Sequence, residues 1–326
     1  MNAETLLLTT LLLPLAGAAG IIITRHTPNV REGVTLLTST LVAVLVVMIA
    51  ARFMDGETFA ITLMEPLPGI AIAFEIEALG MLFALVAGLL WVVTSIYSIG
   101  YMRGHNEQNQ TRFFAAFAVS IAATMGIAFA ANLFTLFLFY ELLTLATYPL
   151  VTHAGSPEAK RGGRTYLGIL LGTSIGLLLL GILVTWSLTG RIDFQAGGIL
   201  AGHIDPAWAG LLYALFLFGI GKAAVMPFHR WLPAAMVAPT PVSALLHAVA
   251  VVKAGVFTLL KVTIYIFGGD FILSNDVTGG LIWVAAATIL IASMVAMTKD
   301  NLKARLAYST VSQLSYIVLG AMLASK

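Results

Sequence analysis

Ten stretches of predominantly apolar residues run through this sequence, and each is about as long as a bilayer is thick. A helix needs about 20 apolar residues to cross the hydrocarbon core of a membrane. The stretches cover residues 4–24, 33–53, 76–99, 113–131, 133–153, 165–188, 208–226, 240–267, 278–298 and 301–324. Only 10% of the 326 residues are charged, against about 25% in soluble domains. The sequence therefore predicts an all-α, polytopic membrane protein with about ten transmembrane helices.

Several classes of protein are excluded or disfavoured by what the sequence contains. There is no cysteine, which excludes disulfides, thiol catalysis, zinc–cysteine sites and iron–sulfur ligation. No basic patch typical of nucleic-acid binding interrupts the spans, and we expect no cofactor and no metal site, although a sodium site built from backbone carbonyls would leave no trace. The first span lacks a basic leader and a clear cleavage site, so we expect it to be retained.

The basic residues are distributed unevenly between the two ends of the predicted spans. Three of the 17 lie inside spans, and Arg52, Arg191 and Lys326 lie in even-numbered loops or at the C-terminus. The other eleven lie in or beside odd-numbered loops: Arg25, Arg31, Arg103, Arg112, Lys160, Arg161, Arg164, Arg230, Lys299, Lys303 and Arg305. Because basic loops stay in the cytoplasm, this asymmetry predicts that both termini lie on the outer side of the membrane. We expect that membrane to be the cell inner membrane.

Five ionisable residues lie within apolar sequence: Glu141, Lys222, His247, Lys253 and Lys261. A charge at the centre of a membrane helix costs about 2.5–3.5 kcal/mol, so each needs a reason. Structural reasons exist: Lys261 could extend its ammonium to the interface, His247 could be a hydrogen-bonded core histidine, and Lys253 could have a purely structural role. Glu141 and Lys222 could form a structural ion pair, although buried pairs stabilise proteins weakly.

The functional alternative is proton transfer. A lysine between helices can change its protonation state when a neighbouring carboxylate moves, and proton relays in pumps consist of such residues. Pro227 follows Lys222 by five residues, and Pro239 and Pro241 prevent a quick return to helix. Freed backbone groups at membrane depth are tolerated only against protein or a water-filled cavity. We therefore expect a broken seventh helix that gives water access to Lys222.

His247 and Lys253 do not fit a single partner on a regular helix. Six residues correspond to about 600° of rotation, so the two side chains diverge by about 120°. Either this helix is distorted, or the two residues serve different steps of a pathway.

Three segments resemble one family of membrane proteins, the proton-translocating antiporter-like subunits. They are "GKAAVMPFHRWLPAAMVAPTPVSALLHAVAVVKAGVF" (221–257), "DNLKARLAYSTVSQLSYIVLG" (300–320) and "LFTLFLFYELLTLATYPLV" (133–151). The family includes subunits of Mrp-type multisubunit cation/proton antiporters and the large membrane subunits of complex I and related hydrogenases. The residues around His247 and Lys253 look most like the D-type member of the Mrp antiporters.

The resemblance implies roles for individual residues. Glu141 and Lys222 correspond to the glutamate and lysine of the fifth and seventh helices that modulate each other. His247 and Lys253 correspond to residues of the proton path on the eighth helix. The accessory candidates are His229, Lys261 and Lys303.

The family architecture also implies a division of the chain. Members usually have fourteen helices around two inverted five-helix repeats. Residues 1–110 would hold the first three helices, 111–268 a complete first repeat, and 278–326 the start of a second repeat cut short, all within a single membrane domain covering 1–326.

These observations favour a proton-translocating subunit of a multisubunit monovalent cation (Na⁺)/proton antiporter. Its expected partners are other membrane subunits, protons, Na⁺ or K⁺, and lipid, with no nucleic acid. Two alternatives stay open. One is a non-redox pumping subunit of an NADH:quinone oxidoreductase or membrane hydrogenase, and the other is a truncated, non-conducting scaffold subunit.

Overall fold

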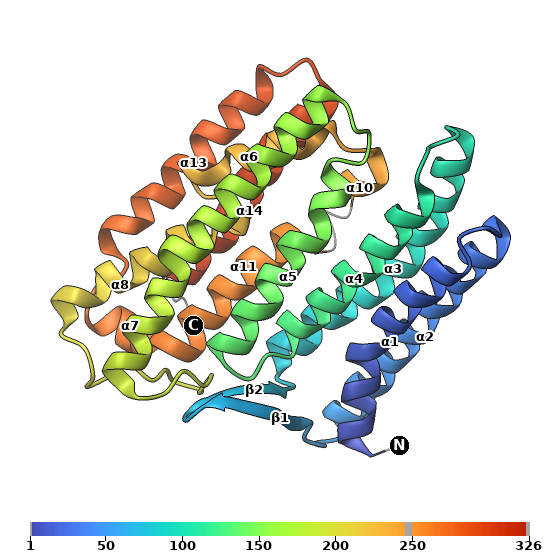
Figure 1. The fold of residues 1–326 in the computed structure, drawn as a ribbon. Helices are drawn as coiled ribbons and strands as arrows, with labels where there is room; N and C mark the ends of the chain where they lie inside the picture. Colours follow the sequence, from blue (N-terminus) through green and yellow to red (C-terminus); the bar gives the residue numbers. More distant parts are fainter. Residues whose placement is uncertain (1, 245–249, 324–326) are drawn as a thin grey trace.

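The computed structural model describes residues 2–244 and 250–323. In this part of the chain, eight helical rods are long and apolar enough to cross a membrane. They lie side by side, inclined in one direction (Figure 1). Their bounds are α1 Ala3–Ile23, α2 Pro28–Met54, α3 Ala78–Gly104, α4 Gln110–Ala128, α5 Leu133–Val151, α6 with α7 Pro157–Thr189, α13 Gly279–Met297 and α14 Leu302–Leu323. The prediction of a polytopic helical membrane protein is confirmed.

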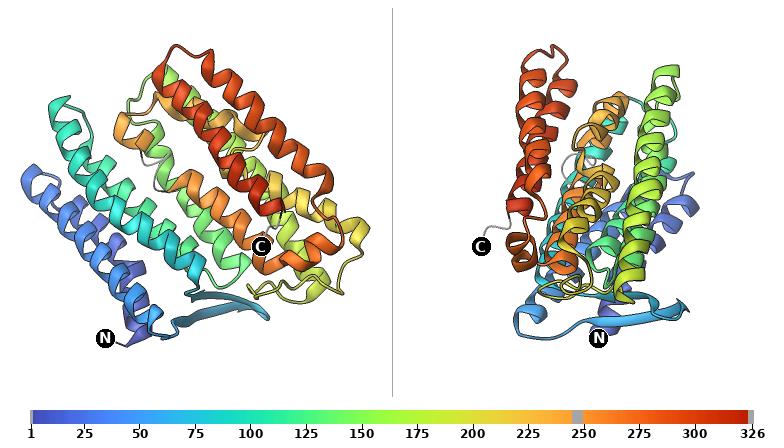
Figure 2. Two further views of the ribbon diagram at one scale, coloured as in Figure 1. Left: turned by 180° about the vertical axis from the view of Figure 1, so that it is seen from behind. Right: turned by 90° about the vertical axis from the view of Figure 1, so that its left-hand side faces the viewer.

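The predicted seventh and eighth spans are both divided into short helices. The predicted seventh span, 208–226, holds α8 (Pro206–Gly219) and η2 (Gly221–Ala223). The short helices η3 (Phe228–Arg230), α9 (Trp231–Ala234) and η4 (Ala235–Val237) follow it. The eighth comprises α10 (Thr240–Ala244), α11 (Val251–Lys261) and the π-helical η6 (Val262–Phe267), and α12 (Gly269–Ser274) follows it. The right-hand view of Figure 2 shows these segments between α6 on one side and α13 and α14 on the other.

The rod formed by α6 and α7 contains a π-helical turn. It runs as α6 (Pro157–Thr173), η1 (Ser174–Leu178) and α7 (Leu179–Thr189). Such turns are rare and often lie at functional sites. Here η1 packs against α8 so closely that a Cβ on Gly219 would collide with the backbone of Leu178.

A β-hairpin that the sequence did not predict closes one end of the bundle. Strands β1 (Ala60–Leu67) and β2 (Ile70–Glu75) pair antiparallel, with Ala60 opposite Glu75. The hairpin lies at the same end as the N-terminus (Figures 1 and 2). It is anchored to the turn between α4 and α5, where Glu75 N donates to Phe129 O at 2.8 Å and Ala131 N donates to Ala73 O at 3.0 Å.

Asn132 lies in the tight turn between α4 and α5. The Asn132 side-chain oxygen accepts a hydrogen bond from Thr135 N at 2.8 Å, and its amide nitrogen donates to Ala71 O at 2.8 Å. The first contact caps α5 and the second fixes the hairpin. One polar residue therefore sets where α5 begins and how the hairpin lies over it.

Helix α11 packs directly on the broken segment after α8. Gly255 is the contact point, because a Cβ built there would collide with the backbone of Lys222 and Ala223. Only glycine permits so close an approach of two backbones. The position of α11 is therefore set by the break.

We expect Gly255→Ala to destabilise the protein by about 1–3 kcal/mol, because an added methyl group forces two backbones apart. Thermal unfolding in detergent micelles measures this. Gly172→Ala on α6 is the matched control, since nothing lies within 4 Å of its Cβ; it should be neutral or stabilise by about 0.5–1 kcal/mol. Equal effects of the two substitutions would contradict the contact.

Candidate functional site

Helix α8 ends at Gly219, before Lys222 and not at Pro227 as the sequence suggested. Ile220 leaves the helical region with φ −81° and ψ 59°, and Ala224 adopts a left-handed conformation with φ 56°. Lys222 lies between them in the single turn of η2. The predicted position of the break is therefore wrong by several residues, and the lysine lies inside the break.

Side chains from distant helices satisfy the backbone groups that the break frees. Trp231 Nε1 donates to Gly221 O at 2.8 Å, Lys222 N donates to Tyr140 Oη at 3.1 Å, and Met226 N donates to Thr288 Oγ1 at 3.3 Å. Irregular backbone at membrane depth requires such partners. Specific hydrogen bonds from other parts of the bundle thus stabilise the break.

Lys222 is completely buried, and oxygen atoms of α5 hold its ammonium group. Nζ donates to Tyr140 O at 2.9 Å and to Thr144 Oγ1 at 2.6 Å. It also lies 3.1 Å from the centre of the Tyr140 ring. A buried charge needs such partners to offset its lost hydration.

Tyr140 O and Thr144 Oγ1 form a cradle for the ammonium of Lys222. Glu141 lies next to this cradle in the sequence, and its side chain makes no hydrogen bond within the described residues. Both of its carboxyl oxygens are buried there and unpaired. Tyr140 and Thr144 share one face of α5, whereas Glu141 is turned about 100° from Tyr140. Glu141 and Lys222 are both described, yet they form no ion pair within 4.0 Å. The ammonium of Lys222 thus rests against one face of α5, and the carboxylate of Glu141 lies on the adjacent face. No ion pair joins them.

Four residues that the sequence analysis missed complete this site: Tyr140, Thr144, Tyr166 and Trp231. Tyr166 Oη lies 2.5 Å from Thr147 Oγ1, one turn beyond Thr144, and its ring packs edge-on against Trp231 at 5.6 Å. The signal in the sequence was the set of polar residues on both sides of Glu141 in an apolar segment. Their partners on α6 and α9 could not be read from it.

The other predicted residues lie elsewhere. Lys253 lines an apolar pocket of about 210 Å³ with residues of α3, α11 and α14, and is turned about 200° from Gly255 around α11. Lys303 Nζ donates to Ala238 O at 2.9 Å. The His229 ring lies 6.0 Å from that of Tyr308. His247 lies outside the described residues.

The proline-rich segment follows the break. Pro227 precedes η3, Pro239 immediately precedes α10, and Pro241 lies in the first turn of α10. Between Ala224 and Thr240 the chain forms only turns of three or four residues. The prolines therefore delay the return to helix, although they do not start the break.

Lys261 does not extend to the membrane interface. Its side chain is 1% exposed, and Nζ forms an ion pair with Glu77 Oε1 at 2.8 Å. The snorkelling interpretation is therefore wrong, because a carboxylate at the start of α3 is within reach.

Comparison with known proteins identifies the family. A family model described as "NADH:quinone oxidoreductase/Mrp antiporter, TM" matches residues 130–326. The chain belongs to this family. A second model, "NADH-Ubiquinone oxidoreductase (complex I), chain 5 N-terminus", matches residues 68–114 of this antiporter-like chain.

Curated relatives come from both branches of the family. NAD(P)H-quinone oxidoreductase subunit 5 of Chlorokybus atmophyticus chloroplasts is 32% identical over 266 residues, covering 76% of this chain and 39% of the relative. The putative antiporter subunit mnhA2 of Staphylococcus epidermidis is 31% identical over 249 residues, covering 75% and 30%. This antiporter-like chain therefore spans less than half the length of these relatives. The likeness to the D-type member of the Mrp antiporters stays a prediction.

A solved structure shares the fold. One chain of the Mrp complex from Dietzia sp. superposes with a TM-score of 0.83 at 24% identity, covering 99% of this chain and 59% of that chain. The overall arrangement of helices in this chain is thus shared with a chain of that complex.

We expect Thr144→Val to destabilise the protein by about 1.5–3 kcal/mol, because it removes a hydrogen bond to a buried charge while keeping the side chain's shape. The free energy of unfolding in detergent micelles is the measurement. Thr298→Val makes the same change at an exposed helix end and should stay within about 0.5 kcal/mol. If both variants behave alike, Thr144 is not a partner of Lys222.

His153 follows α5 at the end remote from the hairpin. Burial lowers the pKa of this imidazole and nearby Arg112 lowers it further, whereas Glu107, 3.8 Å away, acts in the opposite direction. A histidine whose pKa is lower in the folded state stabilises the fold above the unfolded pKa of about 6.5. That contribution is lost as the pH falls through the folded pKa.

The melting temperature should therefore fall as the pH drops below about 6.5, and His153→Gln should reduce this dependence. Melting curves in detergent between about pH 5 and pH 7.5 test it. The exposed His26→Gln is the control and should leave the curve as in the wild type. An unchanged slope in His153→Gln would show that other groups carry the dependence.

Proposed function

We propose that this chain is the proton-translocating subunit of a multisubunit membrane complex that exchanges protons for Na⁺ or another monovalent cation. The observation that carries the proposal is the pair of Lys222 and Glu141. A fully buried lysine lies in a broken helix beside a buried carboxylate that has no hydrogen-bond partner among the described residues. Charges at this depth are costly and are typical of ion and proton pathways.

The geometry supports a two-state switch. In the observed state the ammonium of Lys222 is held by Tyr140 O and Thr144 Oγ1. In a second state it would turn about the axis of α5 to pair with Glu141. Moving the ammonium between a neutral cradle and a carboxylate changes the stability of its proton. A switch of this kind controls when Lys222 accepts and releases a proton.

The proposed route begins on the cytoplasmic side of the break. Lys222 is completely buried in the observed state, so water would reach it only in the second state. The proton then passes by way of His247 and intervening water to Lys253 and on to the outer side. The proposal includes an N-terminus on the outer side of the membrane and a location in the cell inner membrane with other membrane subunits. It also includes residues 111–268 as a complete first repeat and 278–326 as the start of a second.

A second candidate is a proton-pumping subunit of an NADH:quinone oxidoreductase. It is favoured by the match of residues 68–114 to the complex I chain 5 N-terminus and by the 32% identical chloroplast relative. The same buried residues would serve, with redox energy as the driving force.

Transport by everted vesicles containing the full-length protein and its natural neighbours tests the proposal. A pH-sensitive dye reports proton flux after addition of Na⁺, K⁺ or an electron donor. Lys222→Ala and Glu141→Gln should each reduce flux by at least about a hundredfold, the scale of a missing proton-transfer group. Assembly should be preserved. Lys160→Ala, at an exposed lysine, is the matched control.

The trigger distinguishes the candidates. Flux started by a cation supports the antiporter, and flux started only by an electron donor supports the redox-driven pump. Normal flux in Lys222→Ala would show that the buried lysine is structural. Absence of flux in every protein, including the wild type, would favour the scaffold.

A further inference from the structure

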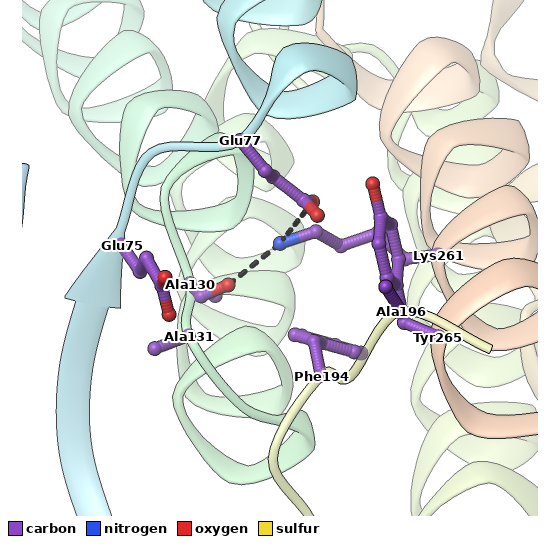
Figure 3. A pocket seen from close by; sticks show the side chains of 8 residues that line it. All are labelled: Glu75, Glu77, Ala130, Ala131, Phe194, Ala196, Lys261 and Tyr265. Atoms are coloured by element: carbon purple, nitrogen blue, oxygen red, sulfur yellow. Dashed lines mark hydrogen bonds and ion pairs between the residues drawn. The ribbon is translucent and has the colours of Figure 1, made fainter. Parts of the chain in front are cut away.

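The two lysines of α11 differ in the partners that the structure gives them. Lys261 Nζ pairs with Glu77 Oε1 at 2.8 Å and donates to Ala130 O at 2.6 Å (Figure 3). Lys253 makes no ion pair and no hydrogen bond within the described residues. It is partly exposed, and its side chain lines an apolar pocket of about 210 Å³. A charge at membrane depth needs a partner, and none of the described side chains provides one for Lys253.

This pocket belongs to a groove along one face of α14. Seen from behind, α11 lies between α3 and α14 (Figure 2, left), and the pocket lies where these three helices meet, with Ile317 as its lining residue on α14. A second pocket, of about 290 Å³, lies between η4, α10 and α14, where Leu306 and Thr310 line it. These three residues of α14 lie within about 40° of one another around its axis and span about 16 Å along it. The two pockets are therefore successive parts of one groove, which we call the α14 groove.

Two uncharged polar side chains in the α14 groove also lack partners. Ser243 lines the second pocket and is 8% exposed, and its hydroxyl has no hydrogen-bond partner among the described residues. Gln313 lies between the two pockets, near the middle of the 22 residues of α14, and is exposed without a hydrogen bond to the described residues. Lipid tails offer no hydrogen bonds, and such side chains in membrane proteins bond to a neighbouring helix. The groove therefore suits a helix better than it suits lipid.

The charge of the groove determines what kind of helix it accepts. Lys253 lines one pocket and Lys303 lines the other, and no carboxylate of the described residues lines either. Lys303 Nζ donates to Ala238 O at 2.9 Å, and that carbonyl does not neutralise its charge. In a medium of low dielectric constant, an opposite charge attracts strongly and a like charge is rejected. The occupant therefore needs a carboxylate at the depth of Lys253.

A second copy of this chain does not meet that requirement. At a two-fold contact the groove would meet itself, and Lys253 would face the same lysine of the other copy. The carboxylates of the described residues lie in loops or near helix ends, apart from Glu141. Both carboxyl oxygens of Glu141 are buried and so are not presented to a neighbour. The carboxylate that fits the groove therefore belongs to a different subunit.

We propose that the α14 groove is the docking site for a transmembrane helix of a partner subunit, and that an Asp or Glu of this helix pairs with Lys253. Gln313 and Ser243 form hydrogen bonds to the same helix. This inference goes beyond the proposed function, because unpaired polar groups carry it whichever reaction drives transport.

Photo-crosslinking from the middle of the groove tests the docking site. The sequence has no cysteine, so Gln313→Cys provides a single thiol for benzophenone maleimide. The full-length protein is labelled and irradiated in native membranes with its neighbouring subunits, and mass spectrometry identifies the crosslinked peptide. We expect an apolar segment of about 20 residues from another subunit that contains an Asp or Glu. Leu37→Cys, at an exposed position of α2, is the control and should not capture this peptide.

The dependence on Lys253 tests the pairing. Added to Gln313→Cys, Lys253→Gln should lower the yield of that crosslink at least about tenfold, the scale of a lost charge-assisted contact. Lys253→Arg keeps the charge and should retain the crosslink. Lys160→Gln, at an exposed lysine, is the matched control and should leave the yield unchanged. Replacing the captured Asp or Glu by its amide should lower the yield as Lys253→Gln does, and the two changes together should cost no more than either alone.

Four results would overturn the proposal. They are capture of lipid only, capture of a second copy of this chain, capture of a segment without Asp or Glu, and a yield that Lys253→Gln leaves unchanged. If size-exclusion chromatography shows that Lys253→Gln does not fold, the amide variant of the captured Asp or Glu decides in its place. The docking site stands or falls on these results whether or not Lys222→Ala abolishes flux, so its failure is distinct from failure of the proposed function.

Discussion

Inside a bilayer, every backbone group that a broken helix releases must find a partner within the protein. This requirement organises the centre of the structure. Tyr140 offers its hydroxyl to the backbone of Lys222 and its carbonyl to the ammonium of the same residue. Trp231 closes the other side by donating to Gly221. The interruption of the helix and the burial of the charge therefore depend on the same side chains, and neither would persist without the other.

The ammonium of Lys222 has two candidate sets of partners on α5, the neutral oxygens of Tyr140 and Thr144 and the carboxylate of Glu141. Ion pairs buried away from water stabilise a protein little, because lost hydration offsets the attraction. A cradle of neutral oxygens is therefore a realistic competitor to the carboxylate of Glu141 for the ammonium of Lys222. The observed structure holds the lysine in the cradle. About 100° around α5 separates the two sets of partners, and exchange between them is what the proposed switch requires.

The sequence predicted the parts of the structure that depend on local composition. The continuous rods and the interruption of the seventh span follow from hydrophobic length and from helix-breaking prolines. The hairpin was missed because Pro66 and Pro68 interrupt its alternation. The end of α8 was misplaced because prolines show where a helix cannot continue, whereas α8 already ends at Gly219, eight residues before Pro227. Glu77 was not recognised as the partner of Lys261 because that contact joins distant segments.

The contact at Gly255 has a mechanical consequence. Two backbones touch there without any intervening side chain, so no soft layer can absorb a displacement. If the turn holding Lys222 shifts, α11 has to slide or tilt with it, and the opposite end of that helix moves relative to the hairpin. Helix α11 thus couples the turn of Lys222 to the hairpin end of the bundle by steric displacement.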